Sequence, residues 1–303
     1  MAVTADDPLG LAPPIVDTEW LAEPKRRSPL WVEALAIVWL CWLYDEINNF
    51  SPLRLHAALA HANSLLHVEN IFHINPELTL NAWAAAHRGL ALSMSDFYDT
   101  AHFVVTLGLV ALLWWRHPER YRPLRNTLVL INVIGFLVFW CYPLAPPRML
   151  PAAGFLDLVA VTHAWGSWRA SAVASQANEL AAMPSLHIAW ACWCSLAVWQ
   201  ILPGRRWRAL VVIYPVMTAL VVMATANHFL LDVVAGVATI VAAAALAQLL
   251  HKWRLARWPG WSGPPPILSR PTRDRLVAAL RTATKDRSGG RPARDSGTDS
   301  RSR

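Results

Sequence analysis

A long apolar run opens with Met183-Pro184-Ser185-Leu186-His187-Ile188-Ala189-Trp190. A helix is expected to begin here, because the ring of Pro184 presets the backbone angle of a first helical turn. The unpaired N–H groups and the dipole of a helix start attract anions. Ser185 and His187 add a hydroxyl and an imidazole to the same turn. The stretch therefore predicts an anion-binding site at the mouth of an apolar helix.

Two further polar islands flank this stretch. Ala145-Pro146-Pro147-Arg148 precedes it, and Asn227-His228-Phe229-Leu230-Leu231-Asp232 follows it at the head of another apolar run. His228 and Asp232 stand at i and i+4, so on a helix they share one face. The carboxylate can then keep one imidazole nitrogen protonated and leave the other to attack, as in a catalytic triad. Arg148 brings a planar fork that binds two phosphate oxygens. Together the islands predict a site that handles a phosphate.

Each island also has an interpretation without chemistry. His228 and Asp232 are, in that view, a buried polar pair that joins helices, and Arg148 is a side chain that extends toward lipid headgroups. Ionisable groups within a membrane span are costly and are usually functional. This cost favours the catalytic interpretation.

The composition indicates an integral membrane protein. The 303 residues are 55% hydrophobic and include 17 Trp, which is far more apolar than an ordinary soluble chain. Apolar runs of about 20 residues recur and predict one polytopic membrane domain. The net charge of +7 would suit nucleic-acid binding. The Lys and Arg residues cluster in short loops and in the tail, however, which is typical of membrane topology signals. We therefore expect a membrane lipid as the partner and no nucleic acid.

The predicted fold is all-α, a polytopic bundle of about six transmembrane helices. The expected spans are residues 30–48, 97–115, 126–142, 184–202, 209–226 and 228–250. Residues 52–90 predict one or two amphipathic helices on the bilayer surface, broken at Asn75-Pro76-Glu77. Residues 143–183 predict a long loop. The expected domains are a disordered tail (1–29), a membrane domain (30–255) and a disordered basic tail (256–303).

Charge alternates between successive loops. Residues 25–27, 116–125, 204–208 and 252–257 are basic, whereas the other loops carry few Arg residues balanced by Asp and Glu. The positive-inside rule then predicts that both termini lie in the cytoplasm. Arg148, His187 and His228 consequently fall together on the extracytoplasmic side of the plasma membrane. That three separately found islands share one face supports a single site.

The three islands resemble the signature motifs of the type 2 phosphatidic acid phosphatase superfamily. That superfamily includes membrane lipid phosphatases and, on a shared helical core, vanadium haloperoxidases. Pro-Ser-Leu-His, in place of the commoner Pro-Ser-Gly-His, resembles the inositol-phosphorylceramide synthase-like branch of inositolphosphotransferases. The motifs cover residues 141–236, and the surrounding spans extend the resemblance over most of residues 30–250.

The resemblance implies a role for each motif residue. His228 is the expected nucleophile that forms a phosphohistidine, and Asp232 orients it. His187 is the expected general acid that protonates the leaving alcohol and later activates the acceptor. Arg148 and Ser185 are the expected phosphate ligands. No metal and no cofactor are expected, because histidine does the covalent work.

Two motif positions depart from the superfamily pattern. Cys141 stands where the first motif usually has a Lys, and Val221-Val222 stands where the third usually has Ser-Arg. Two cations that normally clamp phosphate are therefore missing. Either Arg169 and His163 in the long loop replace them, or the substrate is a phosphodiester with less charge than a monoester.

Three polar residues open the second expected span on the same side. They are expected either to hydrogen-bond a polyol headgroup or to pack on the long loop: Tyr98, Asp99 and His102. The spacing of Tyr98 and His102 places them on one helical side.

The function favoured by these patterns is a membrane enzyme acting on a phosphoester of a phospholipid or prenyl phosphate. Water as acceptor makes the enzyme a phosphatase, and a polyol or lipid alcohol makes it a phosphotransferase. One alternative is a haem-binding protein with His187 and His228 as axial ligands, which leaves Arg148 and Asp232 unexplained. Another is a transporter or structural protein on the same helical core. The sequence predicts neither the substrate lipid nor the oligomeric state.

Overall fold

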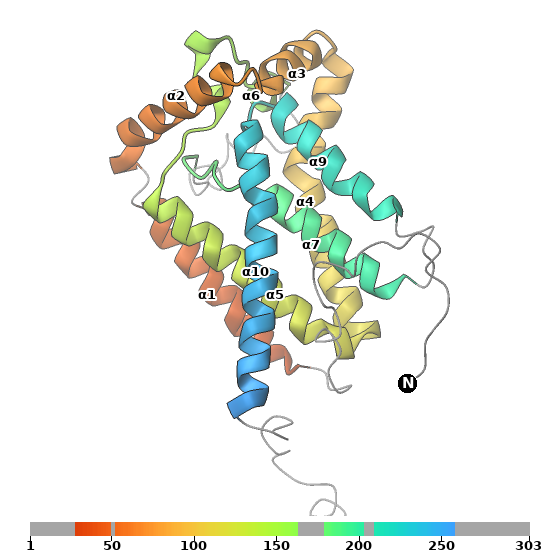
Figure 1. Cartoon of the computed structure of the whole chain (residues 1–303). Helices are drawn as coiled ribbons and strands as arrows, with labels where there is room; N and C mark the ends of the chain where they lie inside the picture. The colour runs from red at the N-terminus through yellow and green to blue at the C-terminus, as the bar shows by residue number, and fades with distance from the viewer. Residues whose placement is uncertain (1–27, 50–51, 163–178, 203–208, 258–303) are drawn as a thin grey trace, which may run out of the picture. The chain divides into compact units, whose positions relative to one another are not determined.

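The computed structural model describes residues 28–49, 52–162, 179–202 and 209–257 (Figure 1). Within these ranges the chain is all-helical, with turns and no strand, as predicted. The helices are α1 (Leu30–Asn49), α2 (Leu55–Ile71), α3 (Pro76–Ala85), α4 (Arg88–Arg116), α5 (Pro118–Cys141), α6 (Leu158–Thr162), α7 (Leu186–Ile201), α9 (Ile213–Ala224) and α10 (Leu230–Arg257). Short 3-10 helices lie at Pro52–Arg54, Pro147–Met149, Pro151–Ala153 and Ala209–Val212.

The chain divides into two compact units, Met1–Trp253 and Arg254–Arg303. All the features described below belong to the first unit. The two predicted tails lie almost entirely outside the described residues.

Three of the described helices are long and apolar enough to cross a membrane. They are α4, α5 and the Leu230–Lys252 part of α10. The expected spans at 30–48, 184–202 and 209–226 correspond to α1, α7 and α9. Of these, α7 and α9 are apolar but shorter, with 16 and 12 residues. The chain is therefore a membrane protein, with three of its expected spans present by length and composition.

The junction between α4 and α5 is much tighter than the basic loop predicted over residues 116–125. Only His117 separates the two helices; Arg116 ends α4, and the other three Arg residues lie in the first turns of α5. Pro118 and Glu119 favour a helix start, because proline suits the first position and a carboxylate suits the positive end of the helix dipole. Arg120 donates to the side chain of Gln200, at 2.8 Å, and Arg125 pairs with Glu33 at 3.3 Å. These contacts hold the arginines on the helix.

The helix α7 runs through the largest apolar core, against α4, α5 and α10. Trp193 is fully buried there, and its indole N–H donates to the carbonyl of Leu124 at 2.9 Å. Glycines let the neighbouring helices approach its start closely. A Cβ built on Gly236 of α10 would lie 2.5 Å from the Ser185 carbonyl, and one on Gly135 of α5 would lie 2.7 Å from the Leu186 side chain. This close packing fixes the start of α7 against α10.

Residues 52–90 form two helices, α2 and α3, and the chain breaks before Pro76 as predicted. Small and apolar residues of α2 pack on the segment that follows α5 and on Phe229. The buried faces also carry polar side chains, which the amphipathic pattern did not predict. Glu69 of α2 and Glu77 and Asn81 of α3 are fully buried. In Figure 1 both helices lie near the N-terminal end of α10.

Candidate active site

His228 and Asp232 meet at the start of α10. The Nδ1 atom of His228 lies 3.5 Å from Oδ2 of Asp232 and 2.9 Å from the carbonyl oxygen of Ala182. His228 is 4% exposed, and Asp232 is fully buried. Both groups around Nδ1 are acceptors, so Nδ1 carries the proton of a neutral ring and Nε2 keeps the lone pair. The lone pair on Nε2 is what a nucleophilic histidine needs.

The contact between His228 and Asp232 has a different local origin from the shared helix face predicted for them. Because α10 begins at Leu230, His228 precedes the helix and Asp232 lies in its first turn. Asp232 Oδ2 reaches back and accepts the N–H of Phe229 at 2.9 Å. A carboxylate in this place satisfies an unpaired donor at the helix start. Asp232 therefore caps α10 and contacts His228 with the same oxygen.

A tight turn between α9 and α10 presents His228. The N–H groups of Asn227 and His228 both donate to the carbonyl of Val222, at 3.0 and 3.1 Å. Ala226 has a φ of 54°, a left-handed conformation that non-glycine residues adopt at a cost of about 1–3 kcal/mol. Val222, where the superfamily motif has an Arg, is fully buried beneath this turn. Its backbone therefore supports the turn, and its side chain supplies no charge.

His187 lies one residue inside α7 and faces His228. The two ring centroids are 5.6 Å apart at 63°. His187 also stacks on Tyr98, with centroids 4.5 Å apart, and meets the ring of His102 at 4.3 Å. The structure thus brings two of the three polar residues of α4 into contact with His187. Asp99 is half-buried on the same helix.

Ser185 is the N-cap residue of α7, and Pro184 lies before the helix rather than in its first turn. The Ser185 N–H donates to the backbone carbonyl of Asp232 at 3.1 Å, which joins α7 to α10. The Ser185 hydroxyl makes no cap hydrogen bond and is buried, without a partner among the described residues. A buried hydroxyl without a partner is costly. Its position beside the first N–H groups of α7 suits a phosphate oxygen.

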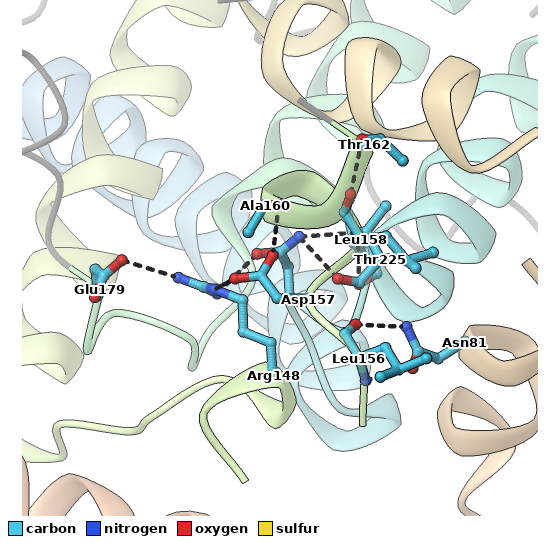
Figure 2. Close-up of polar contacts among 11 residues, drawn as sticks. Asn81, Arg148, Leu156, Asp157, Leu158, Ala160, Thr162, Glu179 and Thr225 are labelled. Atoms are coloured by element: carbon cyan, nitrogen blue, oxygen red, sulfur yellow. Dashed lines mark hydrogen bonds and ion pairs between the residues drawn. The ribbon is translucent and has the colours of Figure 1, made fainter. Parts of the chain in front are cut away.

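Arg148 is held beside the turn that carries His228, and Figure 2 shows its guanidinium pointing toward Asp157 and Glu179. Its Nη1 donates to Oδ1 of Asn227 at 2.7 Å, and its backbone N–H donates to the carbonyl oxygen of Ala226 at 2.9 Å. Its guanidinium also lies 3.6 Å from Asp157 and 3.7 Å from Glu179. The Arg148 side chain is 9% exposed, whereas that of Glu179 is 49% exposed. Arg148 therefore faces two carboxylates, of which that of Glu179 is the more exposed.

Several residues that position the site were missed by reasoning from the sequence. Asn81 donates to the carbonyls of Leu156 and Ala224 at 2.9 and 2.8 Å and accepts the N–H of Leu156 at 2.8 Å. Figure 2 shows this amide against the segment that carries Asp157. The sequence could have indicated Asn227, because it adjoins His228. The only signal for Asn81, Glu69 and Glu77 was the polar character of an otherwise leucine-rich stretch.

Not every residue predicted for the site lies in the described part of the chain. His163 and Arg169 lie outside the described residues. Cys141 is exposed at the end of α5. Within the described ranges, no group of three or more His, Cys, Asp or Glu side chains could hold a metal ion.

A model of the PAP2 superfamily matches residues 63–246, a range that contains Arg148, Ser185, His187, His228 and Asp232. The chain belongs to the PAP2 superfamily. Members of the PAP2 superfamily are phosphatases or phosphotransferases, so the chain is a membrane phosphoesterase of this general type. The match gives the superfamily and not the inositol-phosphorylceramide synthase-like branch. No curated protein and no solved structure matches the chain.

Proposed function

We propose that this chain is a lipid phosphotransferase or phosphatase that works through a phosphohistidine on His228. The observation that carries the proposal is the 3.5 Å contact of His228 Nδ1 with Asp232, with the ring of His187 5.6 Å away. A carboxylate on one nitrogen and a second imidazole across the site are the parts that covalent phosphoryl transfer by histidine needs.

The reaction divides into two halves. In the first, Nε2 of His228 attacks phosphorus, the bond from phosphorus to the leaving oxygen breaks, and His187 gives that oxygen a proton. In the second, His187 takes a proton from the acceptor hydroxyl, whose oxygen attacks phosphorus as the bond to Nε2 breaks. Asp232 stabilises the positive charge that develops on His228. Arg148, Ser185 and the first N–H groups of α7 stabilise charge on the phosphoryl oxygens.

The charges around Arg148 favour a phosphodiester as the donor. Two cations of the usual motifs are replaced by Cys141 and Val222, and Arg148 itself faces Asp157 and Glu179. A dianionic monoester would meet net repulsion here, whereas the single charge of a diester suits one arginine. We therefore favour transfer of a phospho-polyol headgroup, of the inositol phosphate kind, with Tyr98, His102 and Asp99 as its candidate ligands.

The proposed setting is the plasma membrane, with the site on the extracytoplasmic side and both termini in the cytoplasm. In this arrangement α1, α7 and α9 join the three apolar spans in the bilayer, and α2 and α3 lie at its outer surface. The support is the alternation of basic and neutral loops in the sequence.

The decisive experiment measures headgroup release and exchange from labelled phospholipids and prenyl phosphates, without added metal. We expect wild-type protein to act on at least one lipid and His228→Ala to be inactive. His56→Ala, at an exposed histidine of α2, is the matched control and should keep wild-type activity. Label recovered on an added lipid alcohol or polyol identifies a transferase, and label released into the aqueous phase as phosphate or a water-soluble phosphate ester identifies a phosphatase. Wild-type turnover in His228→Ala would refute the proposal.

The haem-binding alternative uses only His187 and His228 and gives no role to the contacts of Arg148, Ser185 and Asp232. A haem absorption band that disappears in His187→Ala would favour it. Transport that survives His228→Ala would favour the transporter.

A further inference from the structure

Two buried glutamates lie beside the start of α10 and have no part in the mechanism above. Glu69 belongs to α2 and Glu77 to the first turn of α3. Both side chains are fully buried. Oε1 of Glu69 accepts the N–H of Leu231 at 2.8 Å, and the two carboxyl groups lie close enough for each to shift the pKa of the other. The pair therefore touches the residue that directly precedes Asp232.

This pair requires a proton. Two ionised carboxylates only accept hydrogen bonds, so one must be protonated for them to bond to each other. Among the described residues, Oε2 of Glu69 and both oxygens of Glu77 are buried without a hydrogen-bond donor. A shared proton is what satisfies these buried oxygens.

The electrostatics of the pair point the same way. Burial is the main cause that raises the pKa of Glu69, to about 9, and the Glu77 hydrogen bond and the charge of Asp232 raise it further. Burial also raises the pKa of Glu77, but its hydrogen bond with Glu69 lowers it. Because the two carboxyl groups titrate together, the raised pKa belongs to the pair. At neutral pH the pair therefore keeps one proton.

The pair belongs to a set of contacts that hold the first turn of α10. The Glu69 carboxyl group accepts a hydrogen bond from the N–H of Leu231, and the Asp232 carboxylate accepts one from the N–H of Phe229. The backbone carbonyl of Asp232 accepts one from the N–H of Ser185. Carboxyl groups at a helix start stabilise it by accepting its unpaired N–H groups. If both glutamates were ionised, three buried carboxylates would repel one another around this turn.

We propose that Glu69 and Glu77 are positioning residues, which share one proton and hold the first turn of α10 so that Asp232 stays in place against His228. The effect on turnover rests on the function proposed above, whereas the shared proton does not. The titratable group that acts on the pair from α10 is Asp232, which in turn contacts His228.

The shared proton gives the fold a defined pH dependence. The raised pKa of Glu69 means that, between 4.5 and about 9, the folded chain binds a proton that the unfolded chain has released. Stability therefore falls as the pH rises through that range, because the unfolded state binds fewer protons than the folded state. Glu69→Gln mimics the protonated form permanently, since its amide donates to Glu77 and its oxygen accepts from Leu231.

The test measures the melting temperature against pH in detergent, and kcat and KM at a temperature well below each variant's melting point. We expect the wild-type melting temperature to fall from pH 6 to pH 9, and that of Glu69→Gln to fall by less than half as much. Glu69→Ala should lose about tenfold or more in kcat with little change in KM, because Asp232 is no longer held against His228. Glu69→Gln should recover most of this loss. The control Asp45→Asn removes an exposed carboxylate from α1 and should match wild type throughout.

Each failure has a separate signature. A Glu69→Gln protein with the wild-type pH dependence of melting overturns the shared proton. A Glu69→Gln protein that does not fold, or that is as slow as Glu69→Ala, also overturns the inference, because Gln keeps both hydrogen bonds. Unchanged kcat in Glu69→Ala overturns the positioning role. Full activity in His228→Ala instead refutes the proposed function. The pH dependence of the melting temperature still tests whether Glu69 and Glu77 share a proton.

Discussion

At the scale of the residue, the two histidines of the site differ in what surrounds them. The Nδ1 atom of His228 faces a carboxylate and a backbone carbonyl, which suits a ring that becomes positively charged. His187 lies against the rings of Tyr98 and His102 and across from His228. In the proposed mechanism, the carboxylate partner therefore suits His228 to the role of nucleophile and His187 to that of proton donor and acceptor.

This difference predicts distinct behaviour of two alanine variants with a nitrophenyl phosphoester, whose leaving group needs no proton. His187→Ala should still release about one nitrophenolate per enzyme in an initial burst, because only the second half needs its base. His228→Ala should give no burst, since it cannot form the covalent intermediate. Stopped-flow absorbance measures both, with His56→Ala as the control. A burst from His228→Ala would contradict the assignment of the nucleophile.

The buried hydroxyl of Ser185 makes a second prediction about a single residue. Ser185→Ala should leave the melting temperature unchanged or raise it, because the hydroxyl has no partner among the described residues and its burial is costly. Activity should nevertheless fall by about 10²-fold, the usual effect of losing one donor to a developing oxyanion. Ser93→Ala, which removes an exposed hydroxyl from α4, is the matched control. A lower melting temperature with full activity would show that Ser185 is structural.

At the scale of the element, the start of α7 is fixed by how closely α10 approaches it. The backbone of Ser185 bonds to that of Asp232, and Gly236 lies one helical turn further along α10. Side chains larger than hydrogen do not fit there, because a Cβ would lie 2.5 Å from the Ser185 carbonyl and 3.0 Å from Ile188. The distance between the His187 and His228 rings therefore depends on a glycine that bears no functional group.

Gly236→Ala should consequently destabilise the protein by about 1–3 kcal/mol, as is usual when a methyl group is forced into a packed interface. It should also lower activity by moving His187 away from His228. The control is Gly108→Ala in α4, where a Cβ would meet nothing within 4 Å. That change should be neutral or stabilise by about 0.5–1 kcal/mol, since alanine is the better helix former. Thermal unfolding and turnover, measured together, would contradict the argument if the two variants behaved alike.

Local signals in the sequence predicted the helices and the central site residues, because those signals lie within a few positions of each other. Apolar runs marked α4, α5, α7 and α10, and the break before Pro76 was visible. The contact of Glu69 with Leu231 joins positions 162 apart, and no periodicity encodes such a pair. The first turns of α5 were wrongly predicted to be a loop, because their arginines interrupt the apolar pattern that marks a span. Their partners, Glu33 and Gln200, are also distant in sequence.

At the scale of the whole membrane domain, two of the long apolar helices, α4 and α10, each have one end by the site and one basic end. On α4, Tyr98 and His102 lie by the site and Arg116 ends the helix. On α10, Asp232 lies at the site and Lys252 lies near the far end. At a rise of about 1.5 Å per residue these two are separated by about 30 Å, close to the thickness of a bilayer core. The site and the basic ends therefore suit opposite surfaces of the membrane.

This polarity predicts which surface an impermeant thiol reagent reaches. In a background without Cys41, Cys141, Cys192 and Cys194, one reporter cysteine replaces exposed Ala152 near the site and another replaces exposed Arg116 at the basic end. In intact cells we expect labelling of Ala152→Cys alone, because the positive-inside rule keeps the basic end in the cytoplasm. Both variants should react after the membrane is permeabilised, which controls for accessibility. Labelling of Arg116→Cys alone in intact cells would place the site on the cytoplasmic leaflet, and the donor and acceptor lipids would then have to be sought there.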